Sequence, residues 1–322
     1  MSGSFILGIT GPTASGKSNL SVLLAKKMNA EIISIDSVQV YKKLNIGTAK
    51  PTITQTNGIK HHLIDIVEPW QIYSSKNFLD DVKACIFQIH ACNKQVLLTG
   101  GTMFYFRVLI EGLSILPSSC QIIRQRLQEI SLQQLYQLLL KYDPETAKQI
   151  SINDRQRIQR VVEISIVNQK PYSLLVKSSP KRGGLGKQII LCALVPKKRQ
   201  VLHKRITQRF YKILEKGFLA EVEKLNKHSL ITADLPSMRS VGYRQALQYL
   251  DGQCNYDHFI SKSIAATRQL AKRQLTWIRN WPTQIKLFEY DQDSCFNVEQ
   301  LCQYFSIMSY PSKYSSVLSL SI

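Results

Sequence analysis

A glycine-rich octapeptide near the N-terminus constrains the fold of this chain more than any other feature of the sequence. It consists of Gly11, Pro12, Thr13, Ala14, Ser15, Gly16, Lys17 and Ser18. This string matches the pattern G-x-x-x-x-G-K-[ST], and it lies between an apolar run that predicts a strand and leucines spaced as in a helix. The glycines let backbone N–H groups converge on phosphate oxygens at the N-terminus of the helix. The octapeptide therefore predicts a site for a diphosphate or triphosphate group.

Further apolar runs predict the sheet that would carry this loop. The predicted strands are 5–9, 31–35, 95–99, 188–195 and 285–290. Helical stretches, among them 80–90, separate the strands, so we predict an α/β fold: a P-loop-type parallel five-stranded sheet with helices on both faces plus helical insertions. Ligands of such sheets bind beyond the carboxyl ends of the strands, which is where the octapeptide, Asp36 and Gly100-Gly101 are expected.

The uneven spacing of the strands predicts how the chain is divided. Two helical stretches between strands are too long for simple crossovers, so we interpret them as added modules. The predicted segments are 1–117 for the first part of the P-loop core, 118–185 for a helical module, 186–204 for a core strand, 205–270 for a basic helical module, 271–310 for a helix and the last core strand, and 311–322 for a loose tail.

The charge of the chain indicates a polyanionic partner. With 42 Lys and Arg against 22 Asp and Glu, the net charge is +20 at pH 7, and a surplus of 14 lies between 181 and 279. One helical face there carries Arg205, Arg209, Lys212 and Lys216. Nucleic acid and an anionic membrane surface are the two candidates. No apolar run approaches the roughly 20 residues of a membrane span, so we expect nucleic acid and no membrane.

Cysteine usage and the N-terminus favour a cytoplasmic protein, which we expect to be a monomer. The seven cysteines are an odd number without a C-x-x-C pair, which disfavours both a disulfide framework and a zinc site. No basic segment precedes an apolar stretch at the N-terminus, as it would in a signal peptide. His61-His62 lacks the third and fourth ligands of a metal site, so we interpret the pair as structural.

The phosphate loop alone leaves several enzyme classes open. A small-molecule or nucleoside kinase and a nucleic-acid-binding NTPase both use such a loop with an acidic residue that orders Mg²⁺ or acts as a base. The candidate carboxylate here is Asp36, and the strand ending Thr99-Gly100-Gly101-Thr102 offers a hydroxyl where a metal-binding Asp is usual. The concentration of positive charge in one part of the chain disfavours a small-molecule kinase. The absence of a metal-binding Asp at the end of the predicted strand 95–99 disfavours an NTPase.

Seven motifs in the correct order give the chain a close resemblance to a known family. They are Gly11–Ser18, Asp36–Tyr41, Asn45–Pro51, Gly100–Tyr105, Asn153–Arg157, Arg239–Arg244 and Thr267–Arg279. Together they span about 6–281, and the chain closely resembles the tRNA dimethylallyltransferases. The resemblance implies that a dimethylallyl group moves from dimethylallyl diphosphate to N6 of adenine 37, in the anticodon stem-loop of tRNAs reading codons that begin with U. Diphosphate is the leaving group.

The resemblance also implies roles for individual residues. Asp36 would be the general base, with Thr13 and Thr102 at the reacting centre and the diphosphate. The octapeptide and Arg209 would bind the diphosphate, and the Ser18 hydroxyl would hold the Mg²⁺ cofactor. The implied tRNA-binding residues are Asp36, Ser37, Val38, Gln39, Arg124, Gln156, Arg157, Ile158, Gln159, Arg160, Arg239, Ser240, Val241, Gly242, Tyr243, Arg244, Lys272, Arg273, Gln274, Leu275, Thr276, Trp277, Ile278 and Arg279.

Overall fold

A computed structural model describes residues 5–116, 120–283, 285–291 and 298–309 of the chain. These residues fall into two compact units. The first combines residues up to Ile110 with those from Leu185 onward, and the second comprises Glu111–Gly184. The helical module predicted at 118–185 falls almost entirely in the second unit, whereas the basic helices predicted at 205–270 belong to the first. The tail predicted at 311–322 lies outside the described residues.

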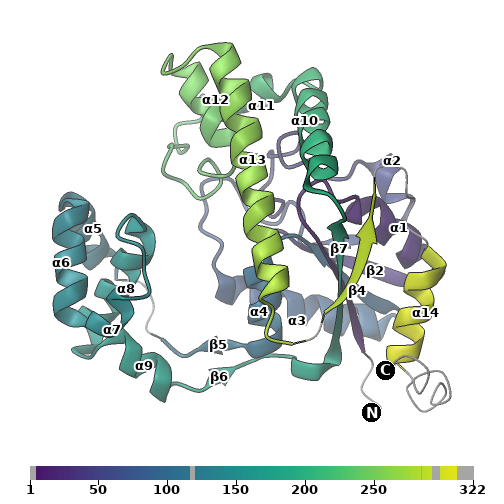
Figure 1. The fold of residues 1–322 in the computed structure, drawn as a ribbon, viewed down its shortest axis with the longest axis horizontal. Helices are drawn as coiled ribbons and strands as arrows, with labels where there is room; N and C mark the ends of the chain where they lie inside the picture. The colour runs from purple at the N-terminus through teal and green to yellow at the C-terminus, as the bar shows by residue number, and fades with distance from the viewer. Residues whose placement is uncertain (1–4, 117–119, 284, 292–297, 310–322) are drawn as a thin grey trace. The chain divides into compact units, whose positions relative to one another are not determined.

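A parallel sheet of six strands forms the centre of the first unit (Figure 1). The strands are β1 (Ile6–Thr10), β2 (Ala30–Ile35), β3 (His61–His62), β4 (Gln95–Gly100), β7 (Ile189–Pro196) and β8 (Lys286–Tyr290), in the order β3-β2-β4-β1-β7-β8. The predicted α/β class with a parallel sheet is confirmed. The predicted number of five strands is wrong by one. The strand that was not predicted is β3, which is only two residues long and contains no apolar run.

Helices cover both faces of this sheet, since the inner strands are buried on both sides. Leu7 and Ile9 of β1 pack in one core cluster with α1 (Lys17–Lys27) and α14 (Val298–Ser309). On the opposite face, Gly8 lies against Phe106 of α4 (Met103–Glu111). α4 stacks through Tyr105 on Phe78 of α3 (Ser75–Ala91), with ring centroids 3.8 Å apart.

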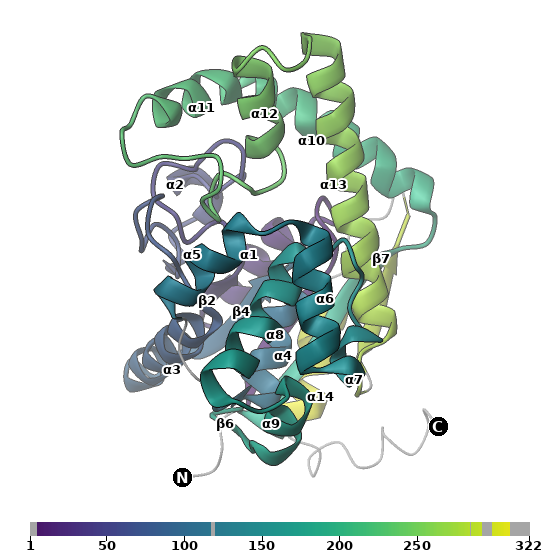
Figure 2. The ribbon, with the colours of Figure 1, turned by 90° about the vertical axis from the view of Figure 1, so that its left-hand side faces the viewer.

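A group of helices stands on the loops that follow β2. It contains α10 (Arg199–Glu215), α11 (Phe218–Asn226), α12 (Tyr243–Leu250) and the long α13 (Tyr256–Arg279), and Figure 2 shows these four together. Their shared core includes Val40 and Tyr41 from the loop after β2, together with Phe210, Phe218 and Phe259 from the helices. The basic helices are therefore joined to the sheet by a continuous hydrophobic core, which explains why they do not form a separate unit.

The second unit is a small helical body closed by a short strand pair. Its helices are α5 (Gln121–Glu129), α6 (Leu132–Tyr142), α7 (Pro144–Ala147), α8 (Arg155–Asn168) and α9 (Tyr172–Ser178), and its antiparallel strands are β5 (Leu113–Ser114) and β6 (Lys181–Arg182). Leu135, Leu139 and Val162 are fully buried in its core. Two further short helices among the described residues, α2 (Ile53–Thr56) and the 3₁₀ turn Gly186–Gln188, belong to the first unit. Among the described helices, none is long and apolar enough to cross a membrane.

Candidate active site

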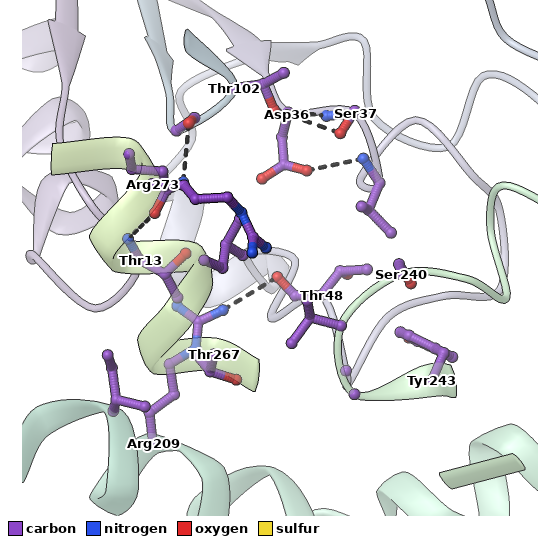
Figure 3. Close-up of a pocket in the computed structure, with 18 of the residues that line it drawn as sticks. Thr13, Asp36, Ser37, Thr48, Thr102, Arg209, Ser240, Tyr243, Thr267 and Arg273 are labelled. Carbon is purple, nitrogen blue, oxygen red and sulfur yellow. Dashed lines mark hydrogen bonds between the residues drawn. The ribbon is translucent and has the colours of Figure 1, made fainter. Parts of the chain in front are cut away.

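The sheet order brings three strand ends together around one cavity. β4 lies between β1 and β2, so the residues that follow these strands meet at the carboxyl edge of the sheet. They line a cavity of about 430 Å³, which α10 and α13 close from the other side. Thr13, Asp36 and Thr102 all contribute to its wall, and Figure 3 shows them converging.

The octapeptide has the backbone geometry of an anion-binding loop. Ala14 has φ 67° and Gly16 has φ 90°, so the chain passes through the left-handed region twice before α1 begins at Lys17. Gly11 approaches the neighbouring strand closely, because a Cβ there would lie 2.7 Å from the Leu194 carbonyl oxygen. The Ser15 hydroxyl is buried and has no hydrogen-bond partner within the described parts of the chain. Such an orphaned polar group at a helix N-terminus fits a loop that is completed by a phosphate.

The two carboxylate oxygens of Asp36 have different surroundings. Oδ1 accepts hydrogen bonds from the backbone N–H groups of Val38, at 2.8 Å, and Gln39, at 3.3 Å. These bonds close an Asx turn that fixes the side chain at the end of β2. Oδ2 accepts no hydrogen bond from any described residue, and Asp36 lines the cavity (Figure 3). A fixed carboxylate with one oxygen available can accept a proton from a bound substrate.

Thr102 links the ends of β2 and β4. Its backbone N–H donates to the Ile35 carbonyl at 3.2 Å, and its Oγ1 accepts from the Ser37 N–H at 3.1 Å. Gly100, two residues before Thr102, has no room for a side chain, because a Cβ would lie 2.0 Å from the Ile35 carbonyl oxygen. The Thr102 hydroxyl is thereby held in the wall of the cavity beside Asp36.

Two cationic side chains, Lys17 and Arg209, interact electrostatically with Asp36. Burial and, next, the nearby positive charge of Arg209 lower the pKa of Lys17, which is about 8 although Asp36 opposes the shift. Burial also lowers the pKa of Arg209, against the effect of Asp36. Concentrating positive charge in a partly dehydrated site is unfavourable unless an anion binds there. The pair is therefore suited to a diphosphate.

Gln274 of α13 joins the phosphate loop to the end of β4. Its Oε1 accepts the Thr13 N–H at 2.8 Å, and its Nε2 donates to the Gly101 carbonyl at 2.9 Å. The next residue back, Arg273, extends into the cavity in Figure 3. The family resemblance predicts that both residues bind tRNA. In the structure, Gln274 contacts the phosphate loop.

Mg²⁺ could be held here only with help from a substrate. Ser18 is exposed on the first turn of α1, where its hydroxyl is available. Across the residues that the structure describes, no group of three or more His, Cys, Asp or Glu could bind a metal ion. Mg²⁺ commonly takes one or two protein oxygens and completes its shell with phosphate oxygens and water. The residues present fit that mode of binding.

Most of the tRNA-binding residues predicted in the first unit lie at or beside the cavity. Those that line it are Asp36, Ser37, Val38, Arg239, Ser240, Val241, Gly242, Tyr243, Arg273, Gln274 and Trp277. Arg244, Lys272, Thr276 and Arg279 are exposed outside it. Gln39 lies behind the wall, where its amide accepts from the Ser34 hydroxyl at 2.9 Å. Leu275 and Ile278 are buried, so their side chains serve the packing of α13.

The predicted residues of the second unit form a cluster of their own. Arg124 Nε lies 3.1 Å and Arg160 Nη1 lies 3.0 Å from Oε2 of Glu163, which is fully buried. Gln159 bonds the Arg124 carbonyl at 3.1 Å, while Gln156 and Arg157 are exposed. Ile158 is fully buried in the hydrophobic core, so its side chain cannot meet a ligand.

Among the described residues, His61 and His62 contact a backbone carbonyl and a carboxylate of the sheet region. His62 Nε2 lies 2.6 Å from Glu31, which also pairs with Lys94 at 2.8 Å. His61 Nδ1 lies 2.9 Å from the Ile59 carbonyl oxygen. Both histidines belong to the edge strand β3, and neither lines the cavity.

Sequence reasoning missed several residues of the cavity wall. Thr48, Phe104, Ile206, Thr267 and Leu270 line it without having been predicted as site residues. Thr48, Phe104, Thr267 and Leu270 do lie inside motifs of the family resemblance, which was a usable signal. Ile206 has only the apolar pattern of its helix, and nothing in that pattern distinguishes a cavity wall from a core.

The comparisons with known proteins agree on one family. The model of the IPP transferase family matches residues 39–281. A tRNA dimethylallyltransferase of Francisella tularensis subsp. novicida is 53% identical over 90% of this chain and 95% of its own length. A tRNA dimethylallyltransferase of Francisella philomiragia is 52% identical over 93% of this chain and 98% of its own.

Solved structures give the same picture. The tRNA isopentenylpyrophosphate transferase of Bacillus halodurans is 30% identical, with a TM-score of 0.70 over 97% of this chain and 99% of that one. A eukaryotic dimethylallyltransferase acting on tRNA is 27% identical, with a TM-score of 0.79 over 96% of this chain and 79% of that one.

Proposed function

The chain belongs to the IPP transferase family of tRNA-prenylating enzymes, and from that membership we propose that it moves the dimethylallyl group of dimethylallyl diphosphate onto N6 of adenine 37 in tRNA. The tRNAs are those that read codons beginning with U. The products are the N6-dimethylallyl adenine and free diphosphate. The enzyme acts in the cytoplasm as a monomer.

The proposal is carried by one observation: the candidate base and the candidate anion site line the same cavity. Asp36 and Thr13 belong to its wall, and Lys17, Arg209 and Asp36 interact electrostatically. A nucleophile that loses a proton and a leaving group that gains negative charge would thus have their partners at opposite sides of one reaction centre. A carboxylate on the far face of the sheet could not serve in this way.

Asp36 would act as the general base. The exocyclic nitrogen of adenine is a weak nucleophile because its lone pair is delocalised into the ring. As N6 attacks C1 of the dimethylallyl group, the C1–O bond to the diphosphate breaks and the nitrogen must lose a proton. The Asp36 oxygen that accepts no hydrogen bond from the described residues can take that proton.

The phosphate loop would hold the leaving group, with no phosphoryl transfer. Charge on the diphosphate rises as the C–O bond breaks, and preorganised donors stabilise that charge best. Lys17, Arg209 and the N–H groups of the loop supply them, and Thr13 and Thr102 would orient the reacting ends. Mg²⁺ on the Ser18 hydroxyl would neutralise part of the diphosphate charge.

Adenine 37 would reach this centre only if it leaves the stacked anticodon loop, as bases do in other enzymes that modify them. The exposed arginines and lysines near the cavity would then contact phosphates, which add affinity without reading sequence. They include Arg239, Arg244, Lys272 and Arg279. We assign Arg124, Arg157 and Arg160 of the second unit to the same kind of contact.

A transfer assay tests the proposal. Purified protein is incubated with Mg²⁺, dimethylallyl diphosphate labelled in the prenyl group, and tRNA carrying A36-A37. We expect label in the tRNA, and none in a matched tRNA in which A37 is replaced by guanosine. Label in both tRNAs would contradict the assignment of adenine 37. ATP hydrolysis or nucleoside phosphorylation without label transfer would support one of the two alternative classes.

A further inference from the structure

A loop after β2 carries a backbone carbonyl to the wall of the cavity. The carbonyl oxygen of Thr48 accepts from Arg209 Nη2 at 3.4 Å and from Gln39 Nε2 at 3.4 Å. Figure 3 shows the contact between Arg209 and Thr48. The placement of the Arg209 guanidinium therefore depends on where this loop holds Thr48.

A carboxylate from α11 holds the same loop immediately before Thr48. Glu221 accepts the N–H groups of three consecutive residues, namely Asn45 at 2.9 Å, Ile46 at 2.8 Å and Gly47 at 3.2 Å. It also accepts the hydroxyl of Tyr243 at 2.6 Å. Successive N–H groups that converge in this way form an anion-binding nest, which a side chain of this protein fills.

The loop has little freedom to move away from this arrangement. A Cβ at Gly47 would lie 2.4 Å from the Phe218 ring and 2.6 Å from the Tyr243 ring, so the backbone packs directly on both. At its far end, the Lys50 ammonium group is bonded to the Tyr41 carbonyl and to Asp65. Burial of Tyr243 and, next, the negative charge of Glu221 raise the pKa of the Tyr243 hydroxyl, which therefore stays a donor.

We propose that Glu221 is a positioning residue for the diphosphate site: it fixes residues 45–47 so that the Thr48 carbonyl holds Arg209 toward the diphosphate. The inference rests on the proposed function, because Arg209 is taken as a diphosphate ligand. Glu221 itself does not line the cavity, so it touches no substrate there. Its effect must pass through Arg209.

The test is a double-mutant cycle read by calorimetric binding of dimethylallyl diphosphate in the absence of tRNA. Glu221→Gln keeps the size of the side chain but turns one acceptor into an N–H₂ group facing N–H donors. We expect the Kd of this variant for dimethylallyl diphosphate to rise about tenfold. A change of this size is expected when hydrogen bonds to a charged group are lost. In an Arg209→Ala background the same change should have no further effect on Kd. A purely structural role would weaken binding in both backgrounds.

Glu223→Gln is the matched control, since Glu223 lies on the same helix, is exposed, and pairs only with Lys227 among the described residues. Its Kd should equal that of the wild type. Glu221→Asp, which withdraws the carboxylate by one methylene, gives a second variant if Glu221→Gln does not fold. We expect that Glu221→Asp, like Glu221→Gln, has no further effect on Kd in the Arg209→Ala background.

If folded Glu221→Gln or Glu221→Asp binds dimethylallyl diphosphate with the wild-type Kd, the inference is overturned and the proposed function is not affected. Equal losses with and without Arg209 would also overturn it. A wild-type chain that binds no dimethylallyl diphosphate would overturn the proposed function, and the inference with it.

Discussion

At the scale of single residues, Asp36 offers the sharpest test because its two oxygens can be separated chemically. In Asp36→Asn, the amide oxygen can keep the bonds from Val38 and Gln39, so the turn is preserved while the proton acceptor is lost. We predict that turnover falls by roughly 10²-fold or more, the contribution of a positioned base. Single-turnover transfer assays measure this, alongside tRNA binding, which should be unchanged.

The control for that variant is Asp80→Asn, which removes an exposed carboxylate paired with Lys76 on α3. It should transfer at the wild-type rate. Near-normal catalysis in Asp36→Asn would mean that another group removes the proton.

Lys17 predicts a pH dependence of diphosphate binding. Its pKa is lowered to about 8, and the protonated form is the one that attracts an anion. Affinity for dimethylallyl diphosphate should therefore be full below pH 8 and decline as the pH rises through 8 and Lys17 loses its proton. At pH 9 about one tenth of the lysine is protonated, so an affinity about tenfold lower is expected. Calorimetry between pH 7 and 9.5 measures it.

Lys17→Arg separates this effect from titration elsewhere, because an arginine stays charged over the whole range. Its binding should be flat between pH 7 and 9.5, whatever its absolute strength. A decline as steep as that of the wild type would rule out Lys17 as the titrating group.

The sequence gives some site residues more readily than others, and the reason is distance along the chain. Gly11, Lys17 and Asp36 occupy local strand–loop patterns whose chemistry can be read from neighbours. Gln274 acts on a loop 261 residues earlier, and Glu221 on one about 175 residues earlier. Gln274 belongs to a motif of the family resemblance and was predicted as a tRNA-binding residue, whereas Glu221 belongs to no such motif. No local pattern predicts the loop that either side chain contacts, so only the fold reveals these two contacts.

At the scale of secondary-structure elements, α13 is predicted to brace the phosphate loop through Gln274. Gln274→Leu would leave the Thr13 N–H and the Gly101 carbonyl without their bonds in a buried site. We expect a loss of about 1–3 kcal/mol in the free energy of unfolding, the cost of unsatisfied buried groups, together with a higher KM for dimethylallyl diphosphate. Urea unfolding and steady-state kinetics check the two effects.

Ser261→Ala serves as its control on the same helix, since the exposed Ser261 hydroxyl bonds the His258 carbonyl of its own helix and belongs to none of the predicted site residues. Both its stability and its KM should stay close to the wild type. A Gln274→Leu protein that matches this control would show that the brace contributes nothing.

The elements themselves were predictable wherever a long apolar run marked them. The predicted strands 31–35 and 95–99 agree with β2 and β4 to within a residue at each end. β3 was missed, since two histidines on a sheet edge carry no periodicity. α3 begins five residues before the predicted helix, at a capping box formed by Ser74 and Asn77 that the apolar pattern does not include.

At the scale of the whole molecule, the excess positive charge predicts salt-dependent binding of tRNA. Lys272 and Arg279 are exposed on α13 outside the cavity wall, so they can be neutralised without touching Arg273 inside it. In the double variant Lys272→Gln, Arg279→Gln, we expect weaker tRNA binding and a shallower dependence on salt, by about 0.7–0.9 per lost phosphate contact. Filter binding at about 50 to 300 mM KCl measures this salt dependence.

Lys26→Gln with Lys76→Gln removes the same charge from exposed sites on α1 and α3, outside all predicted tRNA contacts. This pair should keep the wild-type salt slope. Equal slopes in all three proteins would mean that the carboxyl-terminal part of α13 does not face tRNA.

The division of the molecule was harder to predict than its charge. The basic stretch 205–270 looks like an added module in sequence, yet its helices share a core with Val40, Tyr41 and Leu44 from the loop after β2. That packing joins residues more than 150 positions apart in the sequence, so the composition of the stretch does not predict it. The stretch 111–184, by contrast, has its own hydrophobic core and forms the second unit.

The central claim is that a phosphate loop holds a departing diphosphate and leaves its phosphates intact. The most direct measurement follows both halves of dimethylallyl diphosphate at once, with ¹⁴C in the prenyl group and ³²P in the phosphates. We predict that ¹⁴C enters the tRNA and that an equal amount of ³²P is released as diphosphate. Release of ³²P as orthophosphate, or its appearance in the tRNA, would contradict the account.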